Sequence, residues 1–528
     1  MARKWLLSMA AFIALAPAAA QAEWKQATST NFQVYSEGGE EQLREFAAKL
    51  EKFNFVLRAY HNVTAPPSPI KLKVYLLPSI PAVGKMIGSE GVAGYYISDA
   101  RGLMMVGTRS GGSRRSNDIR TANNETSIDS ESILLHEYAH HFMYQYFPAT
   151  YPTWYSEGFA EFWGATRFLP NNVVEVGRPA SYRFGSFVLN RWLPAAKLLS
   201  AQSYADVPEI DLLYAEGWLL VRLAFEDPER RKQLSNYLTA INGGATYAEA
   251  SAKSFPDVGA LNSDLFQYAG RSRFNVLQLP FKPIPVGDMT VRTVSPAEDA
   301  LMTYSIRLAQ GIRHSDAAEF AGKVRGVAAN FPGDVHALNV LAEAERLAGN
   351  RDAANAALDK LLAIAPNDPR GLMQKGLVQV ASLKAASSAD KKAWDDARGY
   401  FVRAAKIAPK DPLILAAFHE SYRSQGVLPP ESAQNALFEA MELAPSDDDL
   451  RYRVAADFEA RGMIEEALAI IRPLAFTLPA RESAKKKRER EKLEDKYREA
   501  GREKRETARE LFDRLQTKLA EKKAGKPS

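Results

Sequence analysis

The feature that most constrains the fold of this chain is a proline-centred turn that recurs through its second half. Successive turns are separated by 34, 43, 36 and 34 residues, with prolines at Pro332, Pro366, Pro409, Pro445 and Pro479. Self-similarity at a period of about 20 to 50 residues is typical of stacked structural repeats. Each repeat buries its apolar face against its neighbours, so the period predicts an all-α solenoid. A non-repetitive helical bundle is the alternative.

The composition of one repeat narrows this prediction. The segment from His336 to Pro366 mixes small and large apolar residues and carries Gly349 at its turn. In length and pattern it resembles the tetratricopeptide repeat, a helix–turn–helix unit. The resemblance implies a curved solenoid over residues 297–480, with an insertion near residues 385–392 and a concave face that binds a protein partner.

A second feature predicts chemistry. The spacing His-Glu-x-x-His at residues 136–140 lies in a run that reads as a helix. Residues four apart share one helical face, so His136 and His140 can hold one metal ion. Glu137 is then placed to act as general base towards a metal-bound water. The alternative is a surface helix with incidental histidines, but three of the seven histidines in the chain lie in this run.

A catalytic zinc site needs a third protein ligand. No histidine lies between His141 and His314, which favours a carboxylate as this ligand. Glu157 and Glu161 stand four apart in the next expected helix, where Thr153 is placed to cap the first turn. Spacing alone leaves either glutamate open as the ligand.

The order His-Glu-x-x-His, then Trp-x-x-Glu-Gly after a short connection, resembles the gluzincin metallopeptidases of the peptidase MA-like clan. The resemblance implies an α+β zincin-like fold with one Zn²⁺ ion. It assigns His136, His140 and Glu157 as metal ligands and Glu137 as the general base. It also implies that Glu161 is an outer carboxylate that orients a ligand histidine.

A further segment, Tyr214-Ala-Glu-Gly217, is similar to the Tyr-x-x-Gly segment that opens a helix in the aminopeptidase-like gluzincins. Their tyrosine hydroxyl stabilises the oxyanion, so the resemblance implies Tyr214 as a second catalytic residue. The alternative is a core or helix-start tyrosine, with Tyr204, Tyr182 and Arg183 as the other candidates. The Gly-x-Met-Glu-Asn run by which aminopeptidases recognise a free N-terminus is absent from the sequence.

The N-terminus predicts export. Arg3 and Lys4 precede an apolar stretch that ends in Ala20-Gln21-Ala22, a small-x-small cleavage pattern, so residues 1–22 read as a signal peptide. No later stretch is apolar enough to span a bilayer. The periplasm is the expected compartment and full secretion is the alternative. The chain has no cysteine, so it forms no disulfide.

The remaining segments complete the expected layout. Residues 30–36 and 70–77 read as strands on either side of a helix at residues 40–60. Residues 94–98 and 102–107 predict a hairpin just before the metal helix, and a strand there could pair with an extended peptide substrate. Any mixed sheet also needs such an edge strand.

Three prolines in residues 280–285 end the first domain. The predicted domains are a signal peptide (1–22), a gluzincin-like domain (23–280), a linker (281–296), the repeats (297–480) and a charged tail that is helical or disordered (481–528). The net charge of +5, with both signs mixed along the chain, gives no nucleic-acid footprint.

The sequence therefore predicts an exported zinc-dependent peptidase that hydrolyses peptide bonds of a peptide or protein substrate, with repeats that recruit a protein partner. The main alternative is a catalytically inactive metallopeptidase-fold scaffold whose repeats mediate protein–protein interaction in the cell envelope. A structural zinc site is the third possibility, although a base beside three ligands is typical of a catalytic centre.

Overall fold

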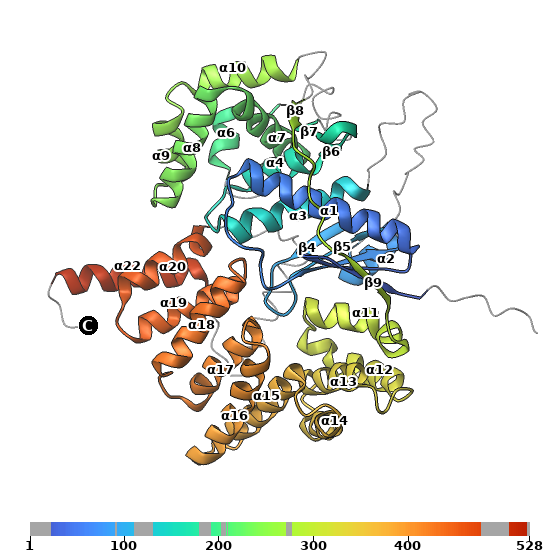
Figure 1. The fold of residues 1–528 in the computed structure, drawn as a ribbon. Helices are drawn as coiled ribbons and strands as arrows, with labels where there is room; N and C mark the ends of the chain where they lie inside the picture. Colours follow the sequence, from blue (N-terminus) through green and yellow to red (C-terminus); the bar gives the residue numbers. More distant parts are fainter. Residues whose placement is uncertain are drawn as a thin grey trace, which may run out of the picture.

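The computed structural model describes residues 23–89, 92–109, 130–178, 192–201, 207, 210–270, 277–476 and 506–524. Figure 1 shows two parts: a mixed α/β part, coloured blue to green, and a helical part, coloured yellow to red, that curves beneath it. Within these ranges no helix has the length and apolarity needed to cross a membrane. The predicted signal peptide, residues 1–22, lies outside the described residues.

A six-stranded mixed sheet forms the base of the first part. Its order is β4-β5-β3-β2-β1-β9, and the strands are β1 (Lys25–Thr28), β2 (Phe32–Ser36), β3 (Leu72–Leu77), β4 (Gly94–Ile97), β5 (Met104–Thr108) and β9 (Thr290–Thr293). The pairs β2–β3 and β3–β5 are parallel, with Val34 opposite Val74 and Val74 opposite Met105. The antiparallel pair β4–β5 confirms the predicted hairpin and places β4 at the edge of the sheet.

Helices cover both faces of this sheet. On one face, Val74 packs with residues of α1 (Glu40–Tyr60) and α3 (Ser130–Tyr146). On the other face, Tyr75 packs with residues of α2 (Ile80–Ile87) and α11 (Pro296–Gln310). Neighbouring side chains on a strand point to opposite faces, which explains why Val74 and Tyr75 belong to different cores. Because α11 is the first helix of the helical part, the helical part supplies one of the two helix layers that cover the sheet.

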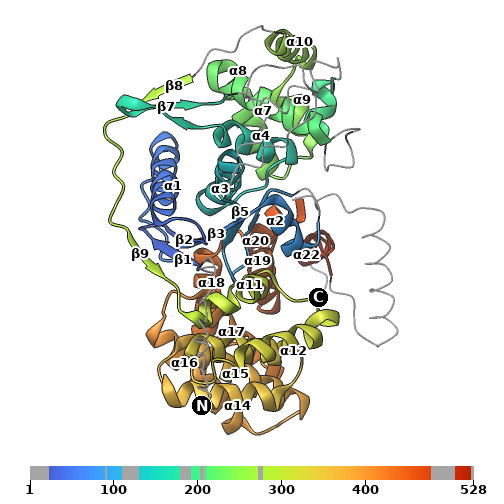
Figure 2. The same ribbon diagram turned by 90° about the vertical axis from the view of Figure 1, so that its right-hand side faces the viewer.

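Beyond α3 the chain builds a second group of helices with a small sheet at their side (Figure 2). In this region α4 (Thr153–Gly164) packs against α3 and α7 (Ile210–Glu226). The small sheet has the order β6 (Arg167–Phe168), β7 (Val173–Val176), β8 (Leu277–Pro280), with a 3₁₀ turn at Pro170–Asn172. The other helices are α6 (Ala195–Ser200), α8 (Pro228–Asn242), α9 (Tyr247–Ser254) and α10 (Val258–Ala269).

The predicted linker over residues 281–296 contains a strand. After β8 the chain runs along the side of the molecule and joins the large sheet as β9, as Figure 2 shows. Val291 of β9 lies opposite Ala27 of β1. The three prolines of residues 280–285 lie before β9, so their missing N–H groups remove no hydrogen bond between β9 and β1. Ser295 then caps α11 directly, so little free linker separates the two parts.

The helical part confirms the all-α prediction for the second half of the chain. After α11 and a short 3₁₀ turn (His314–Asp316), successive helices pack in pairs. They are α12 (Ala317–Ala328), α13 (Val335–Leu347), α14 (Arg351–Ile364), α15 (Pro369–Ala385), α16 (Lys391–Ile407), α17 (Pro412–Gln425), α18 (Glu431–Leu443), α19 (Asp448–Ala460) and α20 (Ile464–Phe476).

The recurring turn has a structural reason. Four of the turns read Pro-x-Asp, and the aspartate side chain accepts a backbone N–H bond at the start of the next helix. These aspartates are Asp334, Asp368, Asp411 and Asp447. Such an N-cap satisfies a donor that the first helical turn leaves without an intrahelical partner. The period in the sequence therefore marks helix starts.

The solenoid curves around the large sheet. Its first helix bonds to the residue before β1, where Trp24 N–H donates to Asp299 Oδ1 at 2.8 Å. Its last helices reach the other side of the first part, where the Thr150 hydroxyl donates to the Pro473 carbonyl at 3.2 Å. Between these points a cavity of about 520 Å³ separates α11, α13, α15, α17 and α19 from the turn at Asp99–Arg101. The side of the solenoid expected to bind a partner thus faces the chain's own sheet (Figures 1 and 2).

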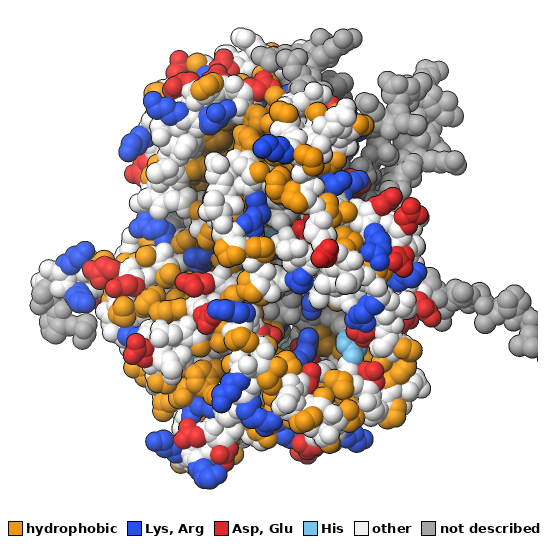
Figure 3. All heavy atoms as spheres, in the orientation of Figure 1, with side chains coloured by type: hydrophobic (Ala, Val, Ile, Leu, Met, Phe, Trp, Pro, Cys, Tyr) orange, Lys and Arg blue, Asp and Glu red, His pale blue; other side chains and the backbone are white. Residues whose placement is uncertain are grey.

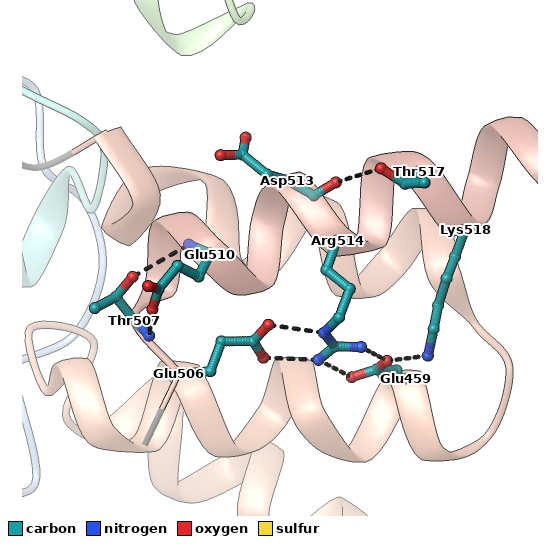
Figure 4. A network of polar contacts seen from close by, with 8 residues as sticks. All are labelled: Glu459, Glu506, Thr507, Glu510, Asp513, Arg514, Thr517 and Lys518. Atoms are coloured by element: carbon teal, nitrogen blue, oxygen red, sulfur yellow. Dashed lines mark hydrogen bonds and ion pairs between the residues drawn. The ribbon is translucent and has the colours of Figure 1, made fainter. Parts of the chain in front are cut away.

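Part of the predicted charged tail is a packed helix. Leu511, Phe512 and Leu515 of α22 (Ala508–Lys523) are buried in one apolar cluster with residues of α20. On the polar side, Arg514 bridges Glu459 and Glu506, and Lys518 also pairs with Glu459 (Figure 4). The apolar spacing of this helix was too short a signal to stand out in a charged segment. Residues 481–505 and 525–528 of the tail lie outside the described residues.

Charges of both signs are interspersed over the surface. On the face drawn in Figure 3, Lys and Arg side chains alternate with Asp and Glu side chains over both parts of the molecule. The small net charge of +5 over 528 residues agrees with this mixture. Many of the exposed charges form ion pairs one helical turn apart, such as Lys323 with Glu319 and Lys392 with Asp396.

Candidate metal centre

Three side chains from two consecutive helices converge above the sheet. The Nε2 atoms of His136 and His140, both on α3, are 3.2 Å apart. Glu157 Oε2, from α4, lies 3.4 Å from each of these nitrogens. In the part of the chain that the structure describes, this is the cluster whose ligand atoms could hold one metal ion.

The spacing of the three atoms fits zinc. A tetrahedral Zn²⁺ with bonds of about 2.0 to 2.1 Å to nitrogen and oxygen holds adjacent ligand atoms about 3.3 to 3.4 Å apart. The observed separations are 3.2, 3.4 and 3.4 Å. Calcium and magnesium favour oxygen ligands, whereas two imidazoles and a carboxylate suit zinc. Three protein ligands also leave a fourth position for water or substrate.

The other nitrogen of each imidazole has its own contact. His136 Nδ1 lies 3.8 Å from Glu161 Oε1, and His140 Nδ1 lies 3.2 Å from the Ser156 hydroxyl. The Ser156 hydroxyl is in turn 3.2 Å from the hydroxyl of Tyr144. Contacts of this kind fix the orientation of a ligand ring. The structure therefore brings Glu157 to the two Nε2 atoms and leaves Glu161 behind the ring of His136.

The electrostatics of this cluster favour a cation. Burial acts to lower the pKa of His136, but the hydrogen bond to Glu157 and the charges of Glu161, Glu157 and Glu137 raise it to about 9. Burial acts to raise the pKa of Glu157, but the two histidines hold it well below its ordinary value. Without a metal, the carboxylates thus keep a proton on His136. A divalent cation would take the place of that proton.

Glu137 belongs to α3, and its side chain contacts the edge strand β4. Burial raises the pKa of its carboxyl, which the charges of His136 and His140 oppose. The carboxylate also accepts a hydrogen bond from the backbone of Tyr96. A Cβ atom at Gly94 would come within 2.6 Å of Ile133, so glycine permits the close approach of β4 to this helix.

Tyr214 stands near the beginning of α7. Its ring is nearly parallel to that of His136, with 6.4 Å between the ring centroids. The structure therefore brings Tyr214 close to the three candidate ligands. The other candidates that the sequence left open, Tyr182, Arg183 and Tyr204, lie outside the described residues.

Gly158 and Gly217, which come from the two segments that resemble the gluzincins, lie against each other. A Cβ atom at Gly158 would lie 2.3 Å from the carbonyl carbon of Gly217, and one at Gly217 would lie 2.2 Å from the Trp154 oxygen. The helices α4 and α7 therefore cross backbone to backbone. At the other end of α4, a Cβ at Gly164 would come within 3.0 Å of the Cα of His136. These small residues let α4 fit between α3 and α7, which places the Glu157 carboxylate.

Two neighbours of the site were missed in the sequence. Tyr96 of β4 has its hydroxyl 2.9 Å from Nδ1 of His141, the third histidine of the metal helix. Burial lowers the pKa of His141 to about 4, so this ring is neutral. Ser156 beside Glu157 was also given no role. Nothing in the spacing distinguishes these residues, because each contact joins separate elements.

Comparison with known proteins finds likeness among repeat proteins. No protein-family model and no curated protein matches the sequence. Similar solved structures include a thermophilic TPR protein of Thermus thermophilus (20% identity, TM-score 0.31, 37% of this chain and 97% of that one). Others are MamA from Desulfovibrio magneticus RS-1 (18%, 0.25, 33% and 90%) and a tetratricopeptide repeat protein from Parabacteroides merdae (13%, 0.28, 55% and 100%). At these scores the likeness carries no argument about function, and the repeat region rests on its own paired helices.

Proposed function

We propose that this chain is a zinc-dependent peptidase of gluzincin type, with a helical-repeat region attached to it. The observation that carries the proposal is the triangle formed by His136 Nε2, His140 Nε2 and Glu157 Oε2, whose sides of 3.2 to 3.4 Å suit one tetrahedral zinc ion. The buried carboxylate of Glu161 behind one ring supports it, because ligand histidines usually have such a partner.

A zinc ion held by these three atoms would polarise a peptide carbonyl and make a bound water more acidic. The residues of the chain supply the remaining functions. Glu137 is the candidate general base, which would accept the proton of the attacking water and deliver it to the leaving amine. Burial raises the pKa of its carboxyl above the ordinary value, which is the direction expected for a carboxylate that acts as general base. The Tyr214 hydroxyl is the candidate donor to the oxyanion of the tetrahedral intermediate.

The second candidate function is a scaffold in which the peptidase-like part has no activity and the repeats bind proteins. The extent of the repeats, from α11 to α20, favours an interaction role. A protein partner remains part of both proposals. Since the concave side of the solenoid faces the chain's own sheet, we expect the partner to bind the outer surface or the open end of the cavity.

From the predicted signal peptide we propose that the protein acts outside the cytoplasm, in the periplasm or, alternatively, after full secretion. No described helix can span a membrane, and the substrate would be a peptide or protein in that compartment. Separating the exported mature chain from the precursor by mass spectrometry, with cleavage after Ala22, tests this placement.

The peptidase proposal is tested by zinc analysis and by cleavage of a broad fluorogenic peptide library. We expect about one zinc per chain and loss of cleavage in Glu137→Ala, because removing a general base costs about 10² to 10⁴ in rate. The matched control is Glu131→Ala on the same helix, which loses a half-buried ion pair with Lys49 and should cleave as the wild type does. Equal cleavage by Glu137→Ala contradicts the proposal.

If the purified chain holds zinc but cleaves nothing in the library, the scaffold function is favoured instead. Where cleavage is observed, Glu137→Gln keeps the shape of the site and removes its base. A pull-down with this variant should then retain substrates that the wild type releases.

A further inference from the structure

The turn between α18 and α19 of the repeat region reaches strand β4. The Ser446 hydroxyl lies 3.4 Å from the hydroxyl of Tyr96 and 3.5 Å from the carbonyl oxygen of Ser98. Asp447 Oδ2 accepts a 2.7 Å hydrogen bond from the backbone N–H of Ala100. Asp447 is buried, so this bond is shielded from water. The turn thus holds both β4 and the residues that follow it.

Tyr96 carries this contact to the metal helix. Its hydroxyl is 2.9 Å from Nδ1 of His141, and the two rings meet edge to face with 5.3 Å between centroids. Its backbone bonds to the carboxylate of Glu137. Tyr96 therefore contacts Glu137, His141 and the α18–α19 turn of the repeat region.

Strand β4 needs such external support. It is four residues long and lies at the edge of the sheet, where β5 is its neighbour. A short edge strand has few ladder bonds, so contacts outside the sheet decide how firmly it is held. The contacts of Ser446 and Asp447 come from residues about 350 positions away in the sequence.

We propose that the α18–α19 turn is a positioning element of the metal site, so that the repeat region is part of the catalytic unit. Ser446 and Asp447 hold β4, and β4 orients Glu137 through Tyr96. This inference rests on the proposed function, because it concerns the orientation of the candidate base. Neither residue touches substrate or metal, so both act through β4.

The repeats provide a matched control for this idea. Asp447 Oδ1 caps α19 by accepting the N–H of Leu450 at 2.9 Å. Asp334 caps α13 in the same way, by accepting the N–H of Ala337 at 2.9 Å. Replacing either aspartate by alanine removes one helix cap, so both variants should lose a similar part of their stability. Asp447→Ala also releases Ala100, so the difference between the two variants isolates the contact with the turn that follows β4.

The test compares kcat on the peptide library, zinc content and amide hydrogen exchange for the full chain and its variants. We expect Asp447→Ala to lower kcat by about tenfold or more at unchanged zinc content, because a displaced base loses rate. Asp334→Ala should stay close to the wild type. The amides of residues 94–100 should exchange faster in Asp447→Ala than in Asp334→Ala. Ser446→Ala, which keeps the cap, should change kcat in the same direction and serves if Asp447→Ala does not fold.

Equal kcat in Asp447→Ala and Asp334→Ala overturns the positioning role and leaves the proposed function standing. A fall in kcat without faster exchange in β4 also overturns it, since the loss would then arise elsewhere. A wild-type chain that holds zinc and cleaves nothing overturns the proposed function together with this inference.

Discussion

Replacing Gly158 by alanine tests whether the crossing of α4 and α7 sets the metal site. The added Cβ would lie 2.3 Å from the carbonyl carbon of Gly217, 2.4 Å from its oxygen and 2.8 Å from the nitrogen of Trp218. Ordinary contact of a Cβ atom begins near 3.4 Å, so the two backbones must separate by about 1 Å. All three atoms belong to the main chain and cannot turn aside as a side chain can.

The shift of α4 would carry Glu157, the preceding residue, with it. Metal–ligand distances hold to within about 0.2 Å, so a movement of about 1 Å removes Oε2 from the reach of the ion. We expect zinc affinity to fall by about a hundredfold, which is the upper range seen when the support of a ligand is lost. Overpacking should also lower the free energy of unfolding of the metal-free protein by about 1 to 3 kcal/mol.

The assays are zinc competition against a fluorescent chelator and urea denaturation of the metal-free protein. Gly217→Ala opens the same crossing, because its Cβ would lie 2.2 Å from the Trp154 oxygen, and should act in the same direction. The control is Gly326→Ala inside α12, where a Cβ meets nothing within 4 Å. The free energy of unfolding of this control should rise by about 0.5 to 1 kcal/mol, and its zinc affinity should not change. Unchanged zinc affinity and stability in Gly158→Ala would refute the reasoning.

Three further predictions follow from other residues. Glu161→Gln should lower zinc affinity by about tenfold in the chelator competition, with the fold unchanged, because the charge behind a ligand ring is lost. Burial raises the pKa of Glu216 from 4.5 to about 8. The folded protein therefore holds this proton more tightly than the unfolded chain, so the free energy of unfolding of the wild type falls as the pH rises across that range. In urea denaturation, Glu216→Gln should lose less of its free energy of unfolding over the same range. Phe512→Ala should lower the free energy of unfolding by about 3 kcal/mol, because its ring is buried between α22 and α20. Arg514→Ala, which removes an exposed ion pair, should lower it by about 1 kcal/mol or less in the same measurement.

Much of the local structure was predictable because it depends on neighbouring residues. The strand at residues 30–36 follows from alternating apolar and polar residues, and the strand at residues 70–77 from the prolines that bound it. The hairpin at residues 94–107 follows from the two segments that flank Asp99-Ala100-Arg101. The structure confirms all three. The helical second half followed from the spacing of its turns. The strand β9 was missed, because four residues between irregular segments carry too weak a pattern.

The candidate site divides in the same way. Placing His136 and His140 on one helical face needs only the period of the α-helix. Choosing between Glu157 and Glu161 needs the angle at which α4 meets α3, and spacing left that choice open. The structure brings Glu157 to the histidines because glycines allow α4 to approach its neighbours closely.

By itself, the sequence determined where helices begin, which residues share a helical face, and that the second half is built of repeated helix pairs. These properties arise from hydrogen bonds and side chains within a few residues. The resemblance to the gluzincins already favoured Glu157, but only the tertiary structure decided that its carboxylate reaches the two imidazoles and that the solenoid faces the chain's own sheet. Both depend on packing between segments far apart in the chain, where shape, burial and backbone contact select one arrangement.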